Sequence, residues 1–412
     1  MKQVKVAIVG AGGQGRGYAA YVQAHPSDAK VVAVADPNTV RRERVAQAND
    51  VPPENRFTDW RELAEKPSLV DAVVISTQDR MHIEPTLAFA AAGRHIMLEK
   101  PMAPTIEECR QIVKAVKDAG IVFAVGHGMR YGPYWRRMKK VIDSGAIGEI
   151  VTVTHLEPVG YWHQAHSFVR GPWRNSKESS FMLLAKSCHD LDILQYIIGK
   201  PCVAVSSFGS LKHFKSSQKP EGAAARCTDC SVEKKCPYSA KKIYLTGHTG
   251  WPVSSITDHF TSEGIAEAVE KGPYGRCVYE CDNDVVDHQV VSLLYEDEVT
   301  ASFTMTAFTP MIRRRTRVMG THGEITGDRI GVNVYDFLTD ETTVYNTDSV
   351  RAPGSHMPGD GGIMKDFIDA VAAGDPSMVS TGPDESLESH AVVFAAEAAR
   401  LRGTVEKVSD YR

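Results

Sequence analysis

Two short segments of the sequence hold the residues best suited to chemistry. The first is the turn Gly10-Ala11-Gly12-Gly13-Gln14-Gly15, which follows an apolar stretch typical of a buried strand. In such a turn Gly10 permits a tight bend, Gly12 lets the backbone approach a pyrophosphate, and Gly15 lets the next helix pack against the strand. Asp36 ends the following apolar stretch at the spacing of a dinucleotide fingerprint. The pattern predicts a dinucleotide site formed by Gly10, Gly12, Gly13, Gln14 and Gly15.

The second segment is Glu99-Lys100-Pro101, which follows the apolar stretch 95–98. If that stretch is a parallel strand, its carboxyl end lies beside the dinucleotide site. The Lys100 ammonium group can then hydrogen-bond the oxygen whose oxidation state changes during hydride transfer. Glu99 has two interpretations, an ion-pair partner of Lys100 or a contact to the nicotinamide ribose.

The choice of cofactor depends on Asp36. Its carboxylate would accept hydrogen bonds from the adenosine ribose and repel a 2′-phosphate, which favours NAD over NADP. Arg41 and Arg42 are near enough in sequence to weaken that preference, although solvated helix residues are the simpler interpretation. After the third predicted strand, Thr77, Gln78 and His82 should line the same site. Alternatively, His82 binds backbone groups at the start of a helix.

Strands alternate with helices over residues 1–125, which predicts a doubly wound parallel sheet, the Rossmann arrangement. The predicted strands are 4–9, 31–35, 71–76, 95–98 and 121–125, and the helices are 17–24, 41–49, 83–92 and 105–119. Residues 126–412 are predicted to form an α+β domain with a large, mostly antiparallel open sheet. Its predicted helices are 135–143, 188–198, 360–373 and 385–401, its strands are 149–156, 285–294, 300–307, 316–319 and 332–338, and residues 157–180 are a loop.

Composition narrows the function. A chain of 412 residues exceeds what one core usually organises, and a net charge of −4 argues against a nucleic-acid partner. We expect no membrane association, because no apolar stretch reaches spanning length and the first residues lead directly into a strand. We therefore expect a cytoplasmic protein, whose 8 cysteines are thiols or metal ligands rather than disulfides.

The sequence resembles the glucose-fructose oxidoreductase / inositol dehydrogenase (Gfo/Idh/MocA) family. The resemblance rests on A-I-V-G-A-G-G-Q-G, D-A-V-V-I-S-T-Q-D-R-M-H, A-G-R-H-I-M-L-E-K-P-M-A, I-D-S-G-A-I-G-E-I and, later, S-C-H-D-L-D-I-L. It implies a Rossmann domain, an α/β domain with an open sheet, NAD or NADP as cofactor, and sugars or cyclitols as substrates. It also matches Lys100 to the family's lysine and His189 to its active-site histidine, and it implies a cis bond before Pro101.

That pair of residues makes chemical sense. Oxidation of an alcohol requires the hydroxyl proton to leave, and a histidine such as His189 is suited to take it while Lys100 stabilises the oxygen. The family usually has an aspartate four residues before the histidine, where this chain has Ala185. Lys186 is then a candidate second cation, which suggests an anionic substrate. Asp192 either orients the imidazole or forms a helix salt bridge, with neither interpretation favoured. Gln78 also departs from the family, which commonly has proline there.

The loop 157–180 is the leading candidate for a substrate wall, since aromatic faces stack on sugar rings and guanidinium groups bind hydroxyls or carboxylates. An interface loop would show the same enrichment. His356, in a late glycine-rich stretch, is either a further site residue or part of a surface turn. The candidate substrate residues are Arg130, Tyr161, Trp162, His163, His166, Arg170, Trp173, Arg174 and Lys186.

An insertion near residues 209–282 is rich in cysteine. Cys227 and Cys230 have the spacing of half a tetrahedral site, Cys236 could be the third ligand, and Cys277 or Cys281 the fourth. A structural zinc is one interpretation and buried free thiols are the other, with an iron–sulfur cluster a lesser alternative.

These observations predict an NAD-dependent oxidoreductase that acts on a secondary alcohol of a sugar, sugar acid or cyclitol. One alternative is an NAD-dependent glycoside hydrolase that oxidises the sugar transiently at C3 and proceeds by elimination. Another is a non-catalytic NAD-binding sensor. An open sheet has a face to bury, so we expect a homodimer or homotetramer.

Overall fold

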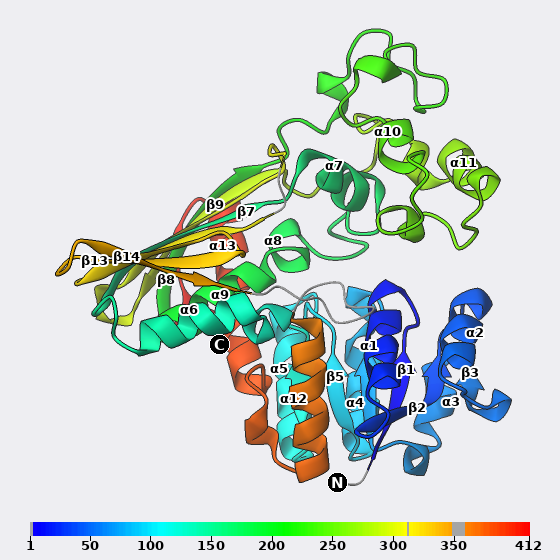
Figure 1. The fold of residues 1–412 in the computed structure, drawn as a ribbon. Helices are drawn as coiled ribbons and strands as arrows, with labels where there is room; N and C mark the ends of the chain where they lie inside the picture. Colours follow the sequence, from blue (N-terminus) through cyan, green and yellow to red (C-terminus); the bar gives the residue numbers. More distant parts are fainter. Residues whose placement is uncertain (1–2, 311–312, 348–358) are drawn as a thin grey trace.

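The computed structural model describes residues 3–310, 313–347 and 359–412. Two sheets organise these residues, and a helical insertion lies beyond the second sheet (Figure 1). Both predicted sheets are confirmed, which makes the chain an α/β protein.

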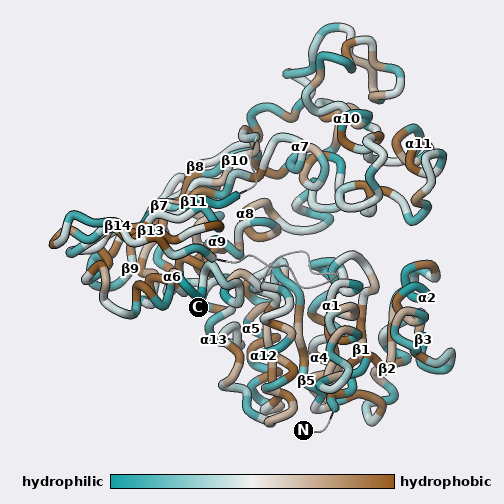
Figure 2. Tube along the Cα trace, in the orientation of Figure 1, coloured by the Kyte–Doolittle hydropathy of each residue, from teal (hydrophilic) through white to brown (hydrophobic). Residues whose placement is uncertain are grey.

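The first sheet is parallel, with the strand order β3-β2-β1-β4-β5-β6. Its strands are β1 (Val4–Val9), β2 (Ala29–Ala35), β3 (Arg56–Phe57), β4 (Ala72–Ile75), β5 (His95–Leu98) and β6 (Phe123–Val125). Their residues are largely buried, as expected for a sheet covered on both faces, and Figure 2 shows hydrophobic residues gathered along them. The order reverses between β1 and β4, so the carboxyl ends of these strands form the switch point where such folds bind ligands.

The helices of this part are α1 (Gly13–Ala24), α2 (Thr39–Ala48), α3 (Trp60–Ala64), α4 (Ile83–Ala91) and α5 (Ile106–Asp118). Neither β3 nor α3 was predicted, because both are too short to show a clear periodicity. The predicted start of α1 at residue 17 is also wrong, since the helix begins at Gly13. The last three residues of the glycine turn thus begin α1, and Gly12 is its N-cap.

The second sheet has nine strands in the order β14-β13-β12-β11-β7-β10-β9-β8-β15. These are β7 (Ile150–Pro158), β8 (Cys202–Ser210), β9 (His288–Tyr295), β10 (Thr300–Thr306), β11 (Arg315–Gly320), β12 (Gly323–Gly327), β13 (Gly331–Asp336), β14 (Glu341–Asn346) and β15 (Val405–Lys407). Among the described strands of this sheet, only β7 and β10 are paired in parallel. The sheet is therefore mostly antiparallel, as predicted.

One face of this sheet is covered and the other is open. The helices α6 (Pro133–Asp143), α9 (Cys188–Ile198) and α13 (Pro383–Arg402) share an apolar core with its inward-facing residues. Buried and exposed residues alternate along β9 and β10. Exposed apolar side chains include Phe208, Val290, Leu294 and Val405. The expectation of a homodimer or homotetramer rests on this open face and stays a prediction.

The chain returns to the first sheet near its end. Helix α12 (Asp360–Ala373) places Ile363, Met364 and Phe367 in the same apolar cluster as residues of β1, β2 and α1. In Figure 1, α12 lies among the elements of the first domain, on the same face of the first sheet as α1. A helix that was expected in the second domain therefore packs on the first.

The predicted loop 157–180 is partly helical. Its residues form α7 (Tyr161–His163) and then the π-helix η5 (Gln164–Arg170), whose residues are all buried. Helical hydrogen bonds satisfy backbone groups that a buried loop would leave without partners. The insertion between β8 and β9 contains α10 (Ala240–Tyr244) and α11 (Ser262–Lys271), and it has apolar clusters of its own. Among the described residues, no helix combines the length and apolar character needed to cross a membrane.

Candidate active site

The glycine turn has the shape that a dinucleotide requires. Gly10 has φ of +90°, and a Cβ atom there would lie 2.6 Å from the Ser76 carbonyl oxygen. A Cβ at Gly15 would lie 2.0 Å from the Gly10 carbonyl oxygen. By contrast, a Cβ at Gly12 or Gly13 would meet nothing within 4 Å. The start of α1 therefore faces open space, and its first amides can serve an anion, which fits the pyrophosphate of NAD.

Asp36 lies at the end of β2, next to this turn. Its carboxylate accepts hydrogen bonds from the backbone N–H groups of Ala11 and Asn38, both at 2.7 Å. Arg42 donates to the Asp36 carbonyl oxygen at 2.8 Å, so this guanidinium group supports the backbone at the strand end. Asp36 thus lies next to the position that the adenosine ribose occupies in a Rossmann fold.

His82 contacts the backbone, which is the alternative that the sequence left open. It is buried, its Nδ1 donates to the Pro101 carbonyl oxygen at 2.8 Å, and its Nε2 lies 3.3 Å from the Thr77 carbonyl oxygen. Burial lowers the pKa of His82, so the ring is neutral near pH 7. These contacts fit the alternative interpretation, and a contact of His82 with the cofactor stays a prediction. His82 holds the segment after Lys100 against the segment after β4.

The two other residues predicted from the segment after β4 lie just before the 3-10 helix η3 (Asp79–Met81). Thr77 donates from Oγ1 to the Met81 carbonyl oxygen at 3.2 Å. Gln78 is exposed and precedes the first residue of η3. Both follow the carboxyl end of β4, and their contact with a cofactor stays a prediction.

Glu99 and Lys100 both follow β5, but their side chains have different surroundings. Glu99 is buried, accepts a hydrogen bond from the Tyr18 hydroxyl of α1, and accepts another from the Lys100 backbone N–H at 3.1 Å. Burial raises the pKa of Glu99 to about 7, against the opposing charge of Lys100. The Lys100 Nζ donates to the Ala185 carbonyl oxygen at 2.9 Å. The bond before Pro101 is cis, as the family resemblance implied.

His189 lies near Lys100, on the first turn of α9. Its ring is buried, and its Nδ1 has no hydrogen-bond partner among the described residues. Burial and the charge of Lys100 lower its pKa well below the usual value, so the imidazole is neutral near pH 7. The ring of His127, just after β6, meets the His189 ring edge-on at 5.7 Å. Lys100 and His189, which are far apart in sequence, are thus close enough for the charge of one to affect the other.

Asp192 and Arg130 bind each other. Arg130, on the 3-10 helix η4 (Gly128–Tyr131), donates from Nε and Nη2 to the two oxygens of Asp192 at 2.8 and 2.7 Å. Both side chains are buried, with exposures of 5% and 1%. The contact of Asp192 is thus a salt bridge to Arg130, and the expectations that Asp192 orients His189 and that Arg130 contacts substrate stay predictions. The pair joins α9 to η4, the segment that follows β6.

Lys186 belongs to a buried charge network. Its Nζ lies 3.2 Å from Oε1 of Glu157, whose Oε2 lies 2.8 Å from Arg314. Arg314 also binds Asp190, which lies 3.0 Å from Nε2 of His155. Burial lowers the pKa of Lys186. The charge of Lys186 is therefore matched by Glu157, and the expectation of an anionic substrate loses its basis.

The arginines predicted for the substrate wall support the insertion instead. Arg170 is buried and donates to the carbonyl oxygens of Arg276 at 2.7 Å and Tyr238 at 2.8 Å. Arg174 forms a bidentate pair with Asp282 at 2.9 and 2.8 Å. These guanidinium groups are engaged with protein groups, and their contact with substrate stays a prediction.

The aromatic residues of the predicted wall gather around one side chain of the insertion. The ring of Trp251 lies 5.0 Å from that of Trp162, 4.9 Å from that of His163 and 5.5 Å from that of His166. Tyr161 is exposed at the start of α7. Contact of Tyr161, Trp162 and His163 with substrate stays a prediction.

His166 is buried, with Nδ1 bonded to the Tyr244 hydroxyl at 2.8 Å, and burial lowers its pKa to about 3. Trp173 lies nearer the first domain, with Nε1 at 3.4 Å from Asp79, a buried residue of η3. Asp79 also accepts hydrogen bonds from Ser179 and Ser180. Trp173 therefore helps join the two domains, and its contact with substrate stays a prediction. His356 lies outside the described residues.

The prediction of a zinc site is corrected. Within residues 3–310, 313–347 and 359–412, no three His, Cys, Asp or Glu side chains are grouped so that they could hold a metal ion. Cys227, Cys230, Cys236, Cys277 and Cys281 are free thiols, as the alternative interpretation held. Cys227 accepts hydrogen bonds from Arg170 at 3.5 Å and from the Ala240 N–H at 3.4 Å. Cys227, Cys236, Cys277 and Cys281 contribute to apolar clusters at the insertion.

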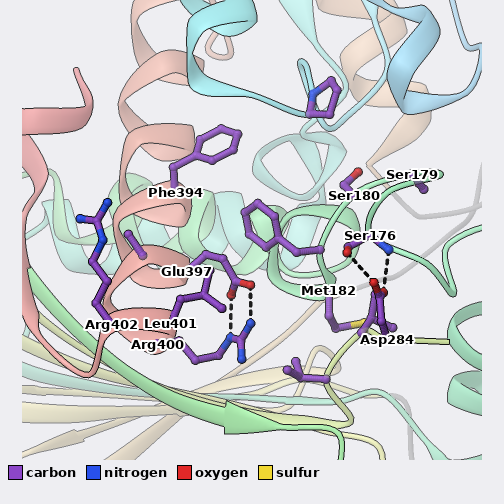
Figure 3. A pocket seen from close by; sticks show the side chains of 15 residues that line it. Ser176, Ser179, Ser180, Met182, Asp284, Phe394, Glu397, Arg400, Leu401 and Arg402 are labelled. Atoms are coloured by element: carbon purple, nitrogen blue, oxygen red, sulfur yellow. Dashed lines mark hydrogen bonds and ion pairs between the residues drawn. The ribbon is translucent and has the colours of Figure 1, made fainter.

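A cavity of about 490 Å³ lies behind the active-site segment, between residues 176–182 and the last turns of α13 (Figure 3). Phe181, Phe394 and Leu401 form apolar parts of its wall. Polar groups of its wall bind one another: Glu397 binds Arg400 at 2.6 Å, and the Ser176 hydroxyl donates to Asp284 at 2.7 Å. Neither Lys100 nor His189 lines it, so this cavity is separate from the candidate site.

Comparisons with known proteins agree with this geometry. Residues 4–127 match the description of an oxidoreductase family with an NAD-binding Rossmann fold, and residues 139–396 match its C-terminal alpha/beta domain. The chain belongs to the Gfo/Idh/MocA oxidoreductase family. Its first domain is therefore an NAD-binding domain, in which the glycine turn and Asp36 lie at the cofactor side of the sheet.

Relatives within the Gfo/Idh/MocA family have several activities. The chain is 31% identical to a scyllo-inositol 2-dehydrogenase (NAD(+)) of Bacillus subtilis over 209 residues, 51% of this chain and 58% of the relative. It is 34% identical to a 2,7-anhydro-N-acetylneuraminate hydratase of Escherichia coli over 146 residues, 35% of this chain and 38% of the relative. The matches thus cover less than two thirds of these relatives. A levoglucosan dehydrogenase in complex with NADH and levoglucosan has the same fold, with a TM-score of 0.73 at 20% identity over 99% of this chain and all of that one.

Several residues at the site were not predicted from the sequence. His127 could have been found, because it follows β6 at the same sheet edge as Lys100. Glu157 and Arg314 carry no local signal, since they pair with Lys186 and Asp190 only in the folded chain. The Ala185 carbonyl oxygen, which accepts from Lys100, is a backbone group that no side-chain motif reveals.

Proposed function

We propose that this chain is an NAD-dependent dehydrogenase that oxidises a secondary alcohol of a sugar, sugar acid or cyclitol. The observation that carries the proposal is the proximity of Lys100 and His189 beside the cofactor side of the sheet. The inositol dehydrogenase relative supports this class of substrate.

The proposed chemistry divides between the two side chains. His189 is neutral near pH 7, because burial and Lys100 lower the pKa of the imidazole, so a ring nitrogen can take the substrate hydroxyl proton. Lys100 uses one ammonium proton for the Ala185 carbonyl oxygen, which leaves two for the substrate oxygen as it gains negative charge. NAD, when bound, supplies the hydride acceptor. The His82–Pro101 hydrogen bond would hold Lys100 in place during this step.

The proposal is tested with Lys100→Ala and His189→Asn. Turnover of sugars, uronates and cyclitols is measured by NADH absorbance, and NAD binding by fluorescence. We expect each variant to bind NAD and to lose turnover by about 100-fold or more, the usual contribution of a positioned acid or base. Lys177→Ala serves as the control, because it removes an exposed lysine of the segment 157–180. A folded Lys100→Ala variant that binds NAD and keeps near-normal turnover would contradict the proposal.

A second candidate is a redox-neutral reaction on a glycoside, and the hydratase relative favours it. The sugar would be oxidised at C3, which acidifies the proton at C2, so that elimination expels the leaving group. Water then adds, and C3 is reduced again. Glycosides in the same substrate panel distinguish the two candidates: a dehydrogenase forms NADH in proportion to product, whereas this reaction releases aglycone with no net NADH. A non-catalytic sensor would bind NAD and convert none of the panel.

A further inference from the structure

The insertion reaches from the substrate side of the molecule to the cofactor domain. Trp251 packs on Trp162 and His163 of the second domain. Seven residues later in the chain, Asp258 contacts two arginines of α2, the helix that follows Asp36. Residues 251–260, which we name the strap, therefore connect Trp162 and His163 to the adenosine side of the predicted cofactor site.

The strap ends in a cluster of charges. The carboxylate of Asp258 lies 3.2 Å from Nε of Arg41 and 3.5 Å from Nη1 of Arg44. Arg44 also donates to the Asp258 carbonyl oxygen at 3.5 Å, and its guanidinium group lies 5.2 Å from the Phe260 ring centre. One carboxylate thus holds two guanidinium groups, and the aromatic ring fixes the second.

A third arginine is near enough to be affected by the cluster. Arg16 lies on the first helical turn after the glycine turn, where a pyrophosphate would bind. Burial and the charges of Arg44 and Arg41 lower the pKa of Arg16, and the charge of Asp258 opposes them. Asp258 therefore contacts two arginines, and its charge also acts on Arg16. An arginine cluster of this kind would suit a phosphate group.

Asp36 does not bind these arginines with its carboxylate. Its two oxygens accept from backbone N–H groups, and Arg42 contacts its carbonyl oxygen. Repulsion by Asp36 disfavours a 2′-phosphate, but Arg41 and Arg44 would attract one if their charges were unmatched. Asp258 supplies the matching charge, from a segment more than 200 residues away in sequence.

We propose that Asp258 is a determinant of cofactor choice, which holds Arg41 and Arg44 away from a 2′-phosphate and so makes the site selective for NAD over NADP. This inference rests on the proposed NAD-dependent function and adds a residue of the insertion to the cofactor site. The strap thereby places a carboxylate, that of Asp258, at the adenosine side of the site.

The test measures the Kd of NAD and of NADP by protein fluorescence for the wild type, Asp258→Asn and Glu263→Gln. Glu263 is an exposed acid of the same insertion that, among the described residues, pairs with neither Arg41 nor Arg44, so its variant has the same change in net charge without breaking these ion pairs. We expect Asp258→Asn to lower the Kd of NADP about tenfold, because two arginines near the surface become available, and to change the Kd of NAD less than about threefold. Glu263→Gln should change neither.

A double variant shows whether the arginines cause the gain. Arg41→Ala in the Asp258→Asn background should return the NADP affinity to near the wild-type value. An unchanged ratio of the two Kd values in Asp258→Asn, with NAD still bound, overturns the role of Asp258 and leaves the proposed function intact. A wild-type chain that binds neither cofactor overturns both.

Discussion

The ion pairs at the nicotinamide side and at the adenosine side of the candidate site differ in how far their side chains are exposed to solvent. Near the nicotinamide side, Arg130 and Asp192 have side-chain exposures of 5% and 1%. At the adenosine side, Arg41 and Asp258 have exposures of 43% and 19%. A buried charge is held by a nearby partner, whereas an exposed pair is screened by water and salt. The first arrangement fixes geometry for chemistry, and the second adjusts selectivity at small cost in stability.

The largest expected difference between the two sides is in stability. Arg130→Ala leaves Asp192 buried without its bidentate partner, so we expect a loss of about 3–5 kcal/mol in the free energy of unfolding. Arg41→Ala breaks the exposed pair and should cost less than about 1 kcal/mol. Denaturant unfolding of the cofactor-free protein measures both. Similar losses of unfolding free energy in the two variants would show that burial does not distinguish the two ion pairs.

A smaller effect is expected for Glu99, and it depends on pH. The carboxyl pKa is about 7 in the folded chain against an ordinary value of 4.5, because burial favours the neutral form. Below about pH 4.5 both the folded and the unfolded state bind the proton, and the folded state is penalised increasingly between about pH 4.5 and about pH 7, above which the penalty is constant. Glu99→Gln removes this penalty.

We therefore expect Glu99→Gln to gain on the order of 2–3 kcal/mol over the wild type at about pH 8 and to gain little at about pH 4.5. Unfolding in denaturant at the two pH values, without cofactor, checks this. Tyr18, Lys100 and Asp360 act on the same carboxyl group. Tyr18→Phe therefore serves as a companion variant that keeps Glu99 ionisable. A gain that is equal at both pH values would show that Glu99 does not titrate in this range.

The smallest expected effect is the salt dependence of the adenosine side. The Debye length falls from about 10 Å at about 0.1 M salt to about 3 Å at about 1 M. The contribution of Asp258 to NAD selectivity, taken as the difference between wild type and Asp258→Asn, should therefore fall roughly two- to threefold over this range. Fluorescence titrations at the two salt concentrations measure it. If the difference does not change with salt, Asp258 acts by shape rather than by charge.

Much of the first domain could be predicted because its signals are local. Strands β1, β4 and β5 are short apolar runs, and the glycine turn marks the start of a helix. The positions of Lys100 and His189 followed from motifs and were then found near each other. By contrast, β8, β12 and β14 were missed, since their polar or exposed residues give weak alternation.

The roles of individual charged residues were harder to predict. Arg170, Arg174 and Arg130 were expected at the substrate, yet each is bound to a protein group. A guanidinium group has the same appearance in sequence whether it binds a carboxylate of the chain or one of a ligand. The cysteine spacing had the same ambiguity, because convergence of four thiols depends on how the insertion folds.

The sequence by itself determined the parallel sheet, the glycine turn, and the identity of Lys100 and His189 as the candidate catalytic pair. The sheet and the turn depend on periodicity and spacing within a few residues, and the catalytic pair was implied by the resemblance to the Gfo/Idh/MocA family. Only the tertiary structure decided which charges are matched: Lys186 by Glu157, Arg130 by Asp192, and Arg41 by Asp258. The physical reason is that the partner of a charge is set by burial and by packing between distant segments, and local sequence patterns do not record either.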